Sequence, residues 1–345
     1  MIKLNEDLEL ILKDTSHLWE GINGENFLIT GGTGFFGKWL LSSFSYINTK
    51  RSLNNKLYVL SRNPSSFLKQ HPEFSDLNDI IFIEGDVTTF EVETEITINY
   101  IIHAATDANM EMNKSSPLLM YDTIVNGTRN ILEIARKKKV KAVLHTSSGA
   151  VYGSQPSHVT HITETYKGCP DISNLNAAYG EGKRVAEMLA NFYYSHYQIN
   201  SKIARCFAFV GPYLPLDGTY AIGNFIRDGL NERDINVQGD GTPYRSYLYA
   251  SDLTTWLWTI LFKGLPCEPY NVGSDKDLTI KELAKLIAGY NQSSVVRIAT
   301  LHPINNKVSR YVPSIDKAKN ELELKINVPL EKAIKKTFEF YNTGV

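Results

Sequence analysis

Short runs of apolar and β-branched residues alternate with longer segments in which apolar residues recur about every 3.6 positions, through the first two thirds of the chain. The short runs are apolar on both faces, as expected of strands that are covered by helices on two sides. They lie at residues 26–30, 56–60, 80–84, 100–103, 141–146 and 202–207. Alternation of this kind predicts parallel strands joined by right-handed crossovers, and therefore an α/β fold with a doubly wound parallel sheet.

The pattern changes after about residue 205, and Gly211-Pro212, Pro215 and Asp217-Gly218 then mark loops. Strand and helix alternate less regularly from here on, and helical periodicity is found at residues 221–230, 252–262, 279–289 and 330–341. We therefore expect a helical extension, a sheet domain and a smaller mixed α/β substrate-binding domain. Their expected bounds are 1–25 for the extension, 26–210 joined by 242–262 for the sheet domain, and 211–241 with 263–345 for the smaller domain.

The composition narrows the choice of partners and compartment. The 345 residues are enough for about two domains, and 36 basic against 37 acidic residues give no basic surface for nucleic acid. The longest apolar stretch, residues 253–262, is shorter than the ~20 residues that cross a bilayer, so we expect no membrane association. No secretion signal is visible, and the separated Cys169, Cys206 and Cys267 are typical of free thiols. We expect a cytoplasmic protein without a metal site.

A glycine-rich segment, Thr30 to Gly37, directly follows the first expected strand and opens a helical pattern. Glycines at such a place let the backbone turn tightly and approach a pyrophosphate, which then lies at the positive N-terminus of the helix. A strand before and a helix after the glycines are typical of Rossmann-like dinucleotide binding, and a structural tight turn is the alternative. The candidate cofactor-binding residues of this segment are Gly31, Thr33, Gly34, Phe35, Phe36 and Gly37.

The end of the second expected strand bears on the choice of cofactor. NAD sites of this kind place an Asp or Glu ~20 residues after the glycines, on the ribose 2′-hydroxyl. No carboxylate occurs between Gly37 and Glu73, and Ser61 and Arg62 stand where a 2′-phosphate would lie. The sequence therefore favours NADP(H) over NAD(H), with a solvated Arg62 as the alternative.

A further pair of cofactor candidates, Asp86 and Val87, follows the third expected strand. The Asp86 carboxylate can accept a hydrogen bond from an adenine amine. An aspartate that stabilises a turn is the alternative.

Tyr179 and Lys183 are four residues apart at the start of a helical segment, so their side chains share one face. An ammonium group beside a phenol favours the phenolate and makes the tyrosine a usable acid/base near neutral pH. Upstream, the fifth expected strand runs into Ser147-Ser148. A serine at the carboxyl end of a parallel strand can bind the same substrate oxygen that the tyrosine protonates, because ligands bind at this edge of such sheets.

These segments together resemble the extended short-chain dehydrogenase/reductase family, which comprises sugar-nucleotide epimerases, dehydratases and ketoreductases. The resemblance covers about residues 26–324. The motifs that carry it, in order, are Thr30–Gly37, His103-Ala104-Ala105, Ser147-Ser148 with Val151-Tyr152-Gly153, Tyr179–Lys183, Arg205-Cys206-Phe207 with Gly211-Pro212, Gly239-Asp240-Gly241 with Arg245 and Asp252, and Asn271-Val272-Gly273.

The resemblance implies a role for several residues. Ser148 is the catalytic hydroxyl, Tyr179 the acid/base, and Lys183 its activator, which also holds the nicotinamide ribose. Arg245 contacts the diphosphate of a nucleotide-diphosphate sugar, and Arg310 is a less certain second contact. The remaining implied binding residues are Ala104, Ala105 and Thr106 for the cofactor and Asn224 for the substrate. The resemblance also implies a homodimer through the helices expected at 118–138 and 177–197.

Two departures from the family pattern narrow the expected chemistry. The 4,6-dehydratases of the family carry an Asp-Glu pair directly after the catalytic hydroxyl, and the uronate decarboxylases usually keep the Glu. Gly149 and Ala150 stand there in this chain, and neither can move a proton. Oxidation or reduction at one sugar carbon, C4 in our reading, remains, either as a 4-ketoreductase or as a C4 epimerase. Arg62 favours the reductase modestly, and a non-catalytic NAD(P)-binding protein is a further alternative.

Overall fold

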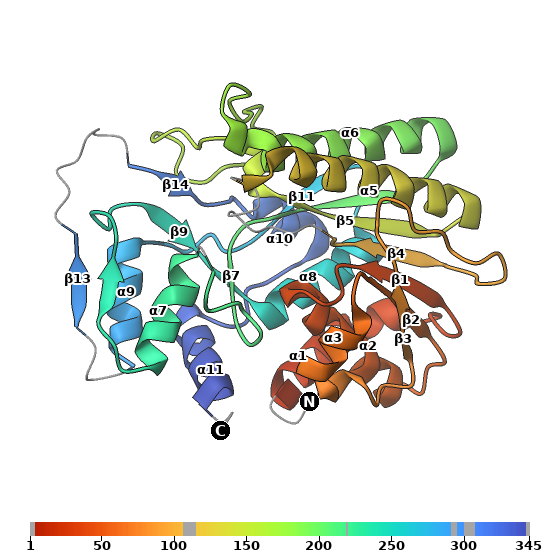
Figure 1. Ribbon diagram of the computed structural model, residues 1–345, viewed down its shortest axis with the longest axis horizontal. Coiled ribbons are helices and arrows are strands. Elements are labelled where there is room, and N and C mark those ends of the chain that lie inside the picture. The colour runs from red at the N-terminus through yellow and green to blue at the C-terminus, as the bar shows by residue number, and fades with distance from the viewer. Residues whose placement is uncertain (1–3, 106–114, 219, 291–294, 300–307, 343–345) are drawn as a thin grey trace.

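The computed structural model describes residues 4–105, 115–218, 220–290, 295–299 and 308–342. Its centre is a seven-stranded sheet in which all paired strands are parallel, in the order β11-β6-β5-β4-β1-β2-β3 (Figure 1). This confirms the predicted doubly wound α/β fold. The strands of the sheet are β1 Asn26–Thr30, β2 Lys56–Ser61, β3 Ile80–Glu84, β4 Tyr100–His103, β5 Ala142–Ser148, β6 Ser201–Cys206 and β11 Pro269–Val272.

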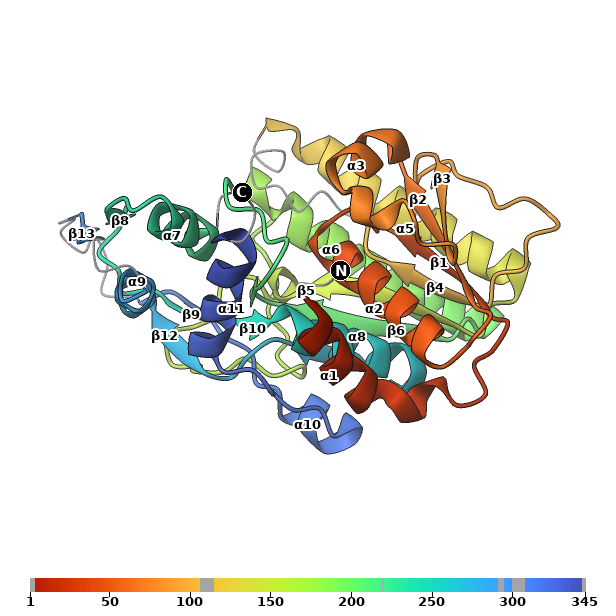
Figure 2. The same cartoon turned by 90° about the horizontal axis from the view of Figure 1, so that it is seen from below.

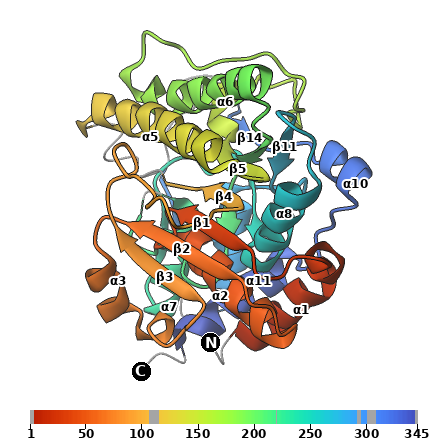
Figure 3. The same ribbon diagram turned by 90° about the vertical axis from the view of Figure 1, so that its right-hand side faces the viewer.

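Helices cover both faces of this sheet (Figure 3). The helices α5 (Pro117–Lys138) and α6 (Ala178–Tyr197) lie side by side on one face. The other face is covered by α2 (Phe35–Lys50) and α8 (Ala250–Lys263), with α1 (Asn5–Thr15) packed against them. Two large apolar clusters separate the sheet from these layers, so both faces of the strands are buried, as their apolar runs predict.

The fifth strand is longer than its predicted span. β5 ends at Ser148, because Ser147 and Ser148 still pair with residues 205 and 206 of β6. The serines therefore lie at the carboxyl end of the strand itself, where backbone pairing fixes their directions. The remaining short helices of this part are η2 Ser16–Trp19 before β1, and α3 Pro64–Gln70, η3 Pro72–Phe74, η4 Gly149–Tyr152 and η5 Leu175–Ala177 between strands.

A second group of elements lies beside the carboxyl ends of the strands and has its own apolar cluster (Figure 2). Its strands form a three-stranded sheet in the order β12-β9-β14 and the pairs β13-β8 and β10-β7. The strands are β7 Phe209–Val210, β8 Ile235–Val237, β9 Tyr244–Ser246, β10 Leu248–Tyr249, β12 Asp277–Thr279, β13 Val296–Ile298 and β14 Arg310–Tyr311. The helices are α7 Ala221–Leu230, α9 Ile280–Ala288 and α11 Leu330–Asn342, whereas α10 (Asp316–Leu322) packs on β11 and α8 and belongs to the apolar cluster of the central sheet.

In the part of the chain that the structure describes, we find no helix that is both long and apolar enough to cross a membrane.

Candidate active site

The turn between β1 and α2 is shaped by backbone contacts that leave no room for side chains. Gly31 has a φ of +74°, and a Cβ added to it would lie 2.5 Å from the Ala104 carbonyl oxygen. A Cβ on Gly37 would lie 2.1 Å from the Gly32 carbonyl oxygen. Glycine is therefore required at both positions, at Gly31 also because its positive φ strains other residues.

Gly34 differs from these two glycines. It is the N-cap of α2 and is exposed to solvent, and the nearest atom to an added Cβ would be 3.5 Å away. Phe36 packs its ring on Phe209 at 5.1 Å and Phe35 lies against Phe36, so these side chains belong to the core. The N-terminus of α2 thus presents backbone rather than side chains at Gly34, which fits the close approach of a dinucleotide pyrophosphate.

The neighbouring strand ends complete the predicted cofactor side. Two hydrogen bonds join the loop after β4 to β1: Ala105 N donates to Thr30 Oγ1 at 3.1 Å, and Ala104 N donates to the Thr30 carbonyl oxygen. Val87 is buried beneath α5, where its side chain contacts Gly127 and its carbonyl oxygen accepts a hydrogen bond from Asn130 Nδ2 at 3.0 Å. Thr33 is half-buried in the turn, and Thr106 lies outside the described residues.

At the end of β2, Arg62 is exposed and Ser61 Oγ accepts a hydrogen bond from Asn63 N at 3.3 Å. Asp86 accepts hydrogen bonds from Thr88 N and Thr88 Oγ1, which together with the nearby Arg62 guanidinium hold the pKa of its carboxyl below the usual value. Asp86 therefore stabilises a turn, the alternative that the sequence left open, and its negative charge lies within electrostatic reach of Arg62.

The predicted proton-transfer residues come together at the carboxyl end of β5. Ser148 Oγ accepts a hydrogen bond from Ala150 N at 3.1 Å, and Tyr179 and Lys183 project from the first two turns of α6. Lys183 Nζ donates to the Thr146 carbonyl oxygen at 2.6 Å and lies 5.9 Å from the centre of the Tyr179 ring. Ser148 and Lys183 are buried and Tyr179 is half-buried, so their interactions are poorly screened by water.

Burial dominates the titration of this cluster. It raises the pKa of Tyr179 strongly, and a hydrogen bond from Ser148 acts in the opposite direction. Burial lowers the pKa of Lys183 to about 8. The sequence predicts that Lys183 makes Tyr179 a usable acid/base near neutral pH, and in the structure desolvation of the phenolate acts against that influence.

A tyrosine that the sequence reasoning missed lies at the same place. The Tyr311 ring packs on Phe207 with centroids 4.7 Å apart, and its hydroxyl would be 2.7 Å from a Cβ on Gly149. Tyr311 is half-buried; burial raises the pKa of its phenol, and the nearby Ser148 hydroxyl acts in the opposite direction. No local pattern of the sequence indicated this position, because it depends on the pairing of β14 with β9.

The two predicted substrate arginines differ in their partners. Arg245, on β9, is half-buried and donates to the Tyr244 carbonyl oxygen at 2.7 Å, and among the described residues no carboxylate forms an ion pair with it. Arg310 Nη1 lies 2.7 Å from Asp277 Oδ2, and its guanidinium stacks 3.9 Å from the Tyr244 ring centre. Arg245 is thus available to an anion, whereas the charge of Arg310 is already neutralised.

Asn224 lies on α7, and its Oδ1 accepts a hydrogen bond from Arg227 Nη1 at 3.2 Å. Its backbone nitrogen donates to the carbonyl oxygen of Tyr220, which precedes the helix. Tyr220 lies within electrostatic reach of Tyr179 and Tyr311, so the start of α7 borders the hydroxyl cluster.

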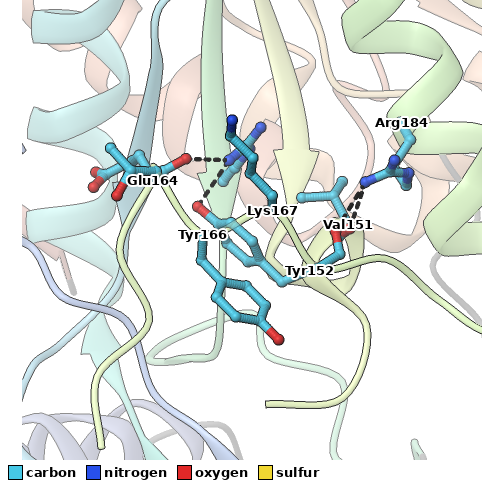
Figure 4. Close-up of a pocket in the computed structure, with 9 residues that line it drawn as sticks. Val151, Tyr152, Glu164, Tyr166, Lys167 and Arg184 are labelled. Atoms are coloured by element: carbon cyan, nitrogen blue, oxygen red, sulfur yellow. Dashed lines mark hydrogen bonds between the residues drawn. The ribbon is translucent and has the colours of Figure 1, made fainter. Parts of the chain in front are cut away.

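A cavity of about 440 Å³ lies beside α6 and has none of the predicted site residues in its lining, which consists of Val151, Tyr152, residues 164–168, Arg184 and Arg205 (Figure 4). Arg205 bonds both oxygens of Glu187 on α6, at 3.0 and 2.7 Å, and donates to Tyr152 Oη at 2.9 Å. Ser147 Oγ donates to the same Glu187 at 2.5 Å. This network fixes α6 against β5 and β6, and so fixes Tyr179 relative to Ser148.

Comparison with known proteins agrees with this arrangement. The profile of the "NAD dependent epimerase/dehydratase family" matches residues 27–273. UDP-glucuronic acid decarboxylase 6 of Arabidopsis thaliana is 29% identical over 313 residues, which are 89% of this chain and 86% of that protein.

Two solved structures share the fold. UDP-glucose 4-epimerase of Thermotoga maritima, solved with UDP-glucose, has a TM-score of 0.76 at 23% identity and covers 92% of this chain and 99% of its own. UDP-glucuronic acid 4-epimerase of Bacillus cereus, solved with UDP-glucuronic acid and NAD, has a TM-score of 0.78 at 20% identity and covers 93% of this chain and 100% of its own.

Proposed function

Because the chain belongs to the NAD dependent epimerase/dehydratase family, we propose that it is an enzyme that oxidises and reduces C4 of a nucleotide-diphosphate sugar. The substrate class is supported by Arg245, a half-buried cation without a carboxylate partner among the described residues, and by the UDP-sugars in the names of its relatives. The chemistry is supported by the hydroxyls of the buried Ser148 and the half-buried Tyr179 beside the buried Lys183 at the end of β5.

Each residue of the cluster has one task in this reaction. Tyr179 takes the proton from the C4 hydroxyl and returns it, and Ser148 holds the same oxygen by a hydrogen bond. Lys183, fixed on the Thr146 carbonyl, supplies positive charge beside the phenol and would hold the nicotinamide ribose. A bound nicotinamide supplies the hydride acceptor and donor, and the backbone around Gly34 would hold its pyrophosphate.

The close contacts around Gly149 are the main support for hydride transfer over dehydration. Elimination of water needs one group to protonate the leaving hydroxyl and another to remove the carbon-bound proton. A side chain at residue 149 would collide with Tyr311 and Phe207, and Ala150 has no ionisable group. These contacts favour hydride transfer at one carbon over dehydration, and the missing carboxylate at Ala150 also disfavours decarboxylation.

We favour a C4 epimerase and keep a 4-ketoreductase as the second candidate. An epimerase returns the hydride to the opposite face of the keto sugar and consumes no cofactor. The reductase is favoured by Ser61 and Arg62, which suit the 2′-phosphate of NADPH. Asp86 weakens that preference, because its carboxylate lies within electrostatic reach of Arg62 and would repel the phosphate.

The test is incubation of the purified protein with UDP-glucose, UDP-glucuronic acid and dTDP-glucose, with separation of the products and measurement of free cofactor. We expect interconversion of at least one sugar with its 4-epimer without net consumption of NAD(H) or NADP(H). Tyr179→Phe is expected to lower the rate by a factor of about 100 to 10,000 and to leave cofactor affinity near that of the wild type. Release of CO₂ from UDP-glucuronic acid, or formation of a 4-keto-6-deoxy sugar, would contradict the proposal.

We also propose a homodimer that packs α5 and α6 against their copies. Met188 and Phe192, four residues apart on α6, are 46% and 50% exposed, and Leu118 and Leu119 are exposed at the start of α5. Sedimentation equilibrium should give twice the chain mass of 38.9 kDa for the wild type. Phe192→Asp should give monomers, and Leu265→Asp, at an exposed apolar residue outside these helices, should not. A monomeric wild type would refute the dimer.

A further inference from the structure

Glu187 on α6 joins this helix to the two strands beneath it. Its Oε1 accepts hydrogen bonds from Ser147 Oγ of β5 at 2.5 Å and from Arg205 Nε of β6 at 3.0 Å, and its Oε2 accepts one from Arg205 Nη2 at 2.7 Å. Ser147 and Arg205 are paired residues of the neighbouring strands. The side chains of Glu187 and Arg205 are only 12% and 14% exposed, so water screens this ion pair little. One carboxylate therefore bridges β5, β6 and α6, one residue before Ser148.

The position of Glu187 along α6 connects this bridge to the proposed proton-transfer residues. Tyr179, Lys183 and Glu187 are spaced four residues apart, so their side chains lie along one face of the helix. Lys183 Nζ donates to the carbonyl oxygen of Thr146, the strand residue next to Ser147, at 2.6 Å. Lys183 and Glu187 thus attach α6 to consecutive residues of β5.

The same arginine also holds the turn that follows Ser148. Arg205 Nη1 donates to Tyr152 Oη at 2.9 Å, and Tyr152 Oη donates to Asn271 Oδ1 at 2.8 Å. Tyr152 is the last residue of η4, the short helix that Ser148 caps. The Glu187–Arg205 pair therefore lies between the two segments that carry the proposed catalytic groups, α6 on one side and the end of β5 with η4 on the other.

Glu187 also contributes negative charge near Lys183. Burial lowers the pKa of Lys183 to about 8, and the Glu187 carboxylate acts in the opposite direction. Arg205 pairs with this carboxylate and is the further charged group beside it. Burial disfavours the charged form of the other titratable groups near Lys183, which are Tyr179 on α6, His103 on β4, His145 on β5 and Cys206 on β6. Glu187 is therefore the group of this set whose charge favours the Lys183 ammonium.

We propose that Glu187 is a positioning residue for the C4 reaction: its bonds to β5 and β6 set α6 beside Ser148, and its negative charge favours the ammonium form of Lys183. The inference rests on the proposed function and adds a group that acts through the residues already assigned. Glu187 gains and loses no proton in the reaction, because both of its carboxylate oxygens accept hydrogen bonds from Arg205 or Ser147.

Removal of the Ser147 hydroxyl tests the bond to β5. The substrate is whichever of UDP-glucose, UDP-glucuronic acid and dTDP-glucose the wild type converts. Ser147→Ala keeps the Glu187–Arg205 pair and should lower kcat about tenfold with KM within about twofold, because α6 is then held less exactly. Ser45→Ala is the matched control and should keep the wild-type kcat, because Ser45 is also buried and donates to a carboxylate, that of Asp79 before β3, away from the site. A wild-type kcat in Ser147→Ala, or an equal loss in both variants, would overturn the proposal.

Glu187→Gln tests the charge. The reaction needs the Lys183 ammonium, so kcat should fall as the pH rises through the Lys183 pKa, which is about 8 in the wild type. Loss of the Glu187 charge lowers this pKa, so the falling limb of the kcat–pH profile should move to lower pH by about half a unit or more. Ser147→Ala keeps the charge, and its falling limb should stay in place. An unchanged limb in Glu187→Gln would overturn the role of the charge.

A double variant separates positioning from stability. Glu187→Gln leaves the Arg205 charge without its partner and should destabilise the protein strongly. Glu187→Met combined with Arg205→Met removes both charges and keeps similar side-chain volumes, so it should melt near the temperature of the wild type. It should nevertheless show the lowered kcat and the shifted limb, because the carboxylate that binds Ser147 and acts on Lys183 is gone. Wild-type kinetics in this double variant would overturn the proposal and assign the ion pair to stability alone.

A measurement without substrate separates this inference from the proposed function. In protein labelled with ¹³Cε-lysine, the resonance missing in Lys183→Met reports the ionisation of Lys183. Its pKa should be lower in Glu187→Gln and in the double variant than in the wild type, and unchanged in Ser45→Ala. A wild type that converts none of the three sugars refutes the proposed function and leaves this titration as the test. A Lys183 pKa that is equal in all these proteins refutes the Glu187 inference alone.

Discussion

The β1–α2 turn and the proposed catalytic edge at the end of β5 lie at the same edge of the sheet but are built by different means. The turn is a continuous segment whose shape requires glycine, because Gly31 and Gly37 have no room for a Cβ. The catalytic edge brings together Ser148, Tyr179 and Tyr311, hydroxyls from three distant segments, and depends on their orientation. A methyl group added to the turn should therefore destabilise the fold through steric contact. Removal of a hydroxyl from the catalytic edge should instead lower activity through lost hydrogen bonds and leave the fold intact.

The largest expected effect contrasts two glycines of the turn. Gly37→Ala places a Cβ 2.1 Å from the Gly32 carbonyl oxygen and should lower the free energy of unfolding by about 3 kcal/mol. Gly34→Ala meets no atom closer than 3.5 Å and has a negative φ, so it should fold almost as well as the wild type. The same methyl group should nevertheless weaken cofactor binding about tenfold or more, because it stands where the pyrophosphate approaches.

Urea unfolding of the protein without added cofactor measures the first effect, and calorimetric titration with NAD⁺ measures the second. Gly21→Ala is a suitable control for backbone strain, because Gly21 has a φ of +75° but open space around its Cβ position. Unfolding free energies that are equal for Gly37→Ala and Gly34→Ala would show that steric contact does not govern this turn.

The same difference explains how much the sequence predicted. The glycine turn could be predicted because its strand, glycines and helix are contiguous, and the helix spacing placed Tyr179 and Lys183 on one face. The location of Ser148 at the strand end also followed from the order of the segments. These features arise from local periodicity.

Tyr311 could not be predicted in this way, because its position depends on the pairing of β14 with β9 and on the space at Gly149, more than 150 residues earlier. The pairing of Arg310 with Asp277 is likewise a contact between strands that no local pattern reveals. The sequence also could not predict the burial at the site, which raises the pKa of Tyr179 against the expected influence of Lys183.

The second prediction compares the two arginines on neighbouring strands of the small sheet. Arg245→Gln should weaken the binding of UDP about 10- to 100-fold, because it removes a half-buried cation that has no carboxylate partner among the described residues. Arg310→Gln should weaken it less than threefold, because Asp277 already neutralises that charge. Calorimetric titration with UDP measures both, with the melting temperature as a control for folding. Equal losses of affinity would mean that Arg310 leaves Asp277 to bind the diphosphate.

The smallest expected effect concerns the residues expected beside the cofactor ribose, where side-chain charge rather than backbone shape should determine binding. Arg62 is exposed and Asp86 lies within its electrostatic reach, so their charges act on a 2′-phosphate with opposite signs. Arg62→Ala should weaken NADP⁺ binding about two- to fivefold and leave NAD⁺ binding unchanged, since exposed charges contribute about 1 kcal/mol or less. Asp86→Asn should strengthen NADP⁺ binding by a similar factor, and 1 M salt should suppress both changes by screening. Equal losses of NAD⁺ and NADP⁺ affinity in Arg62→Ala would mean that Arg62 contacts a part of the cofactor other than the 2′-phosphate. The charge-based argument for the reductase would then be removed.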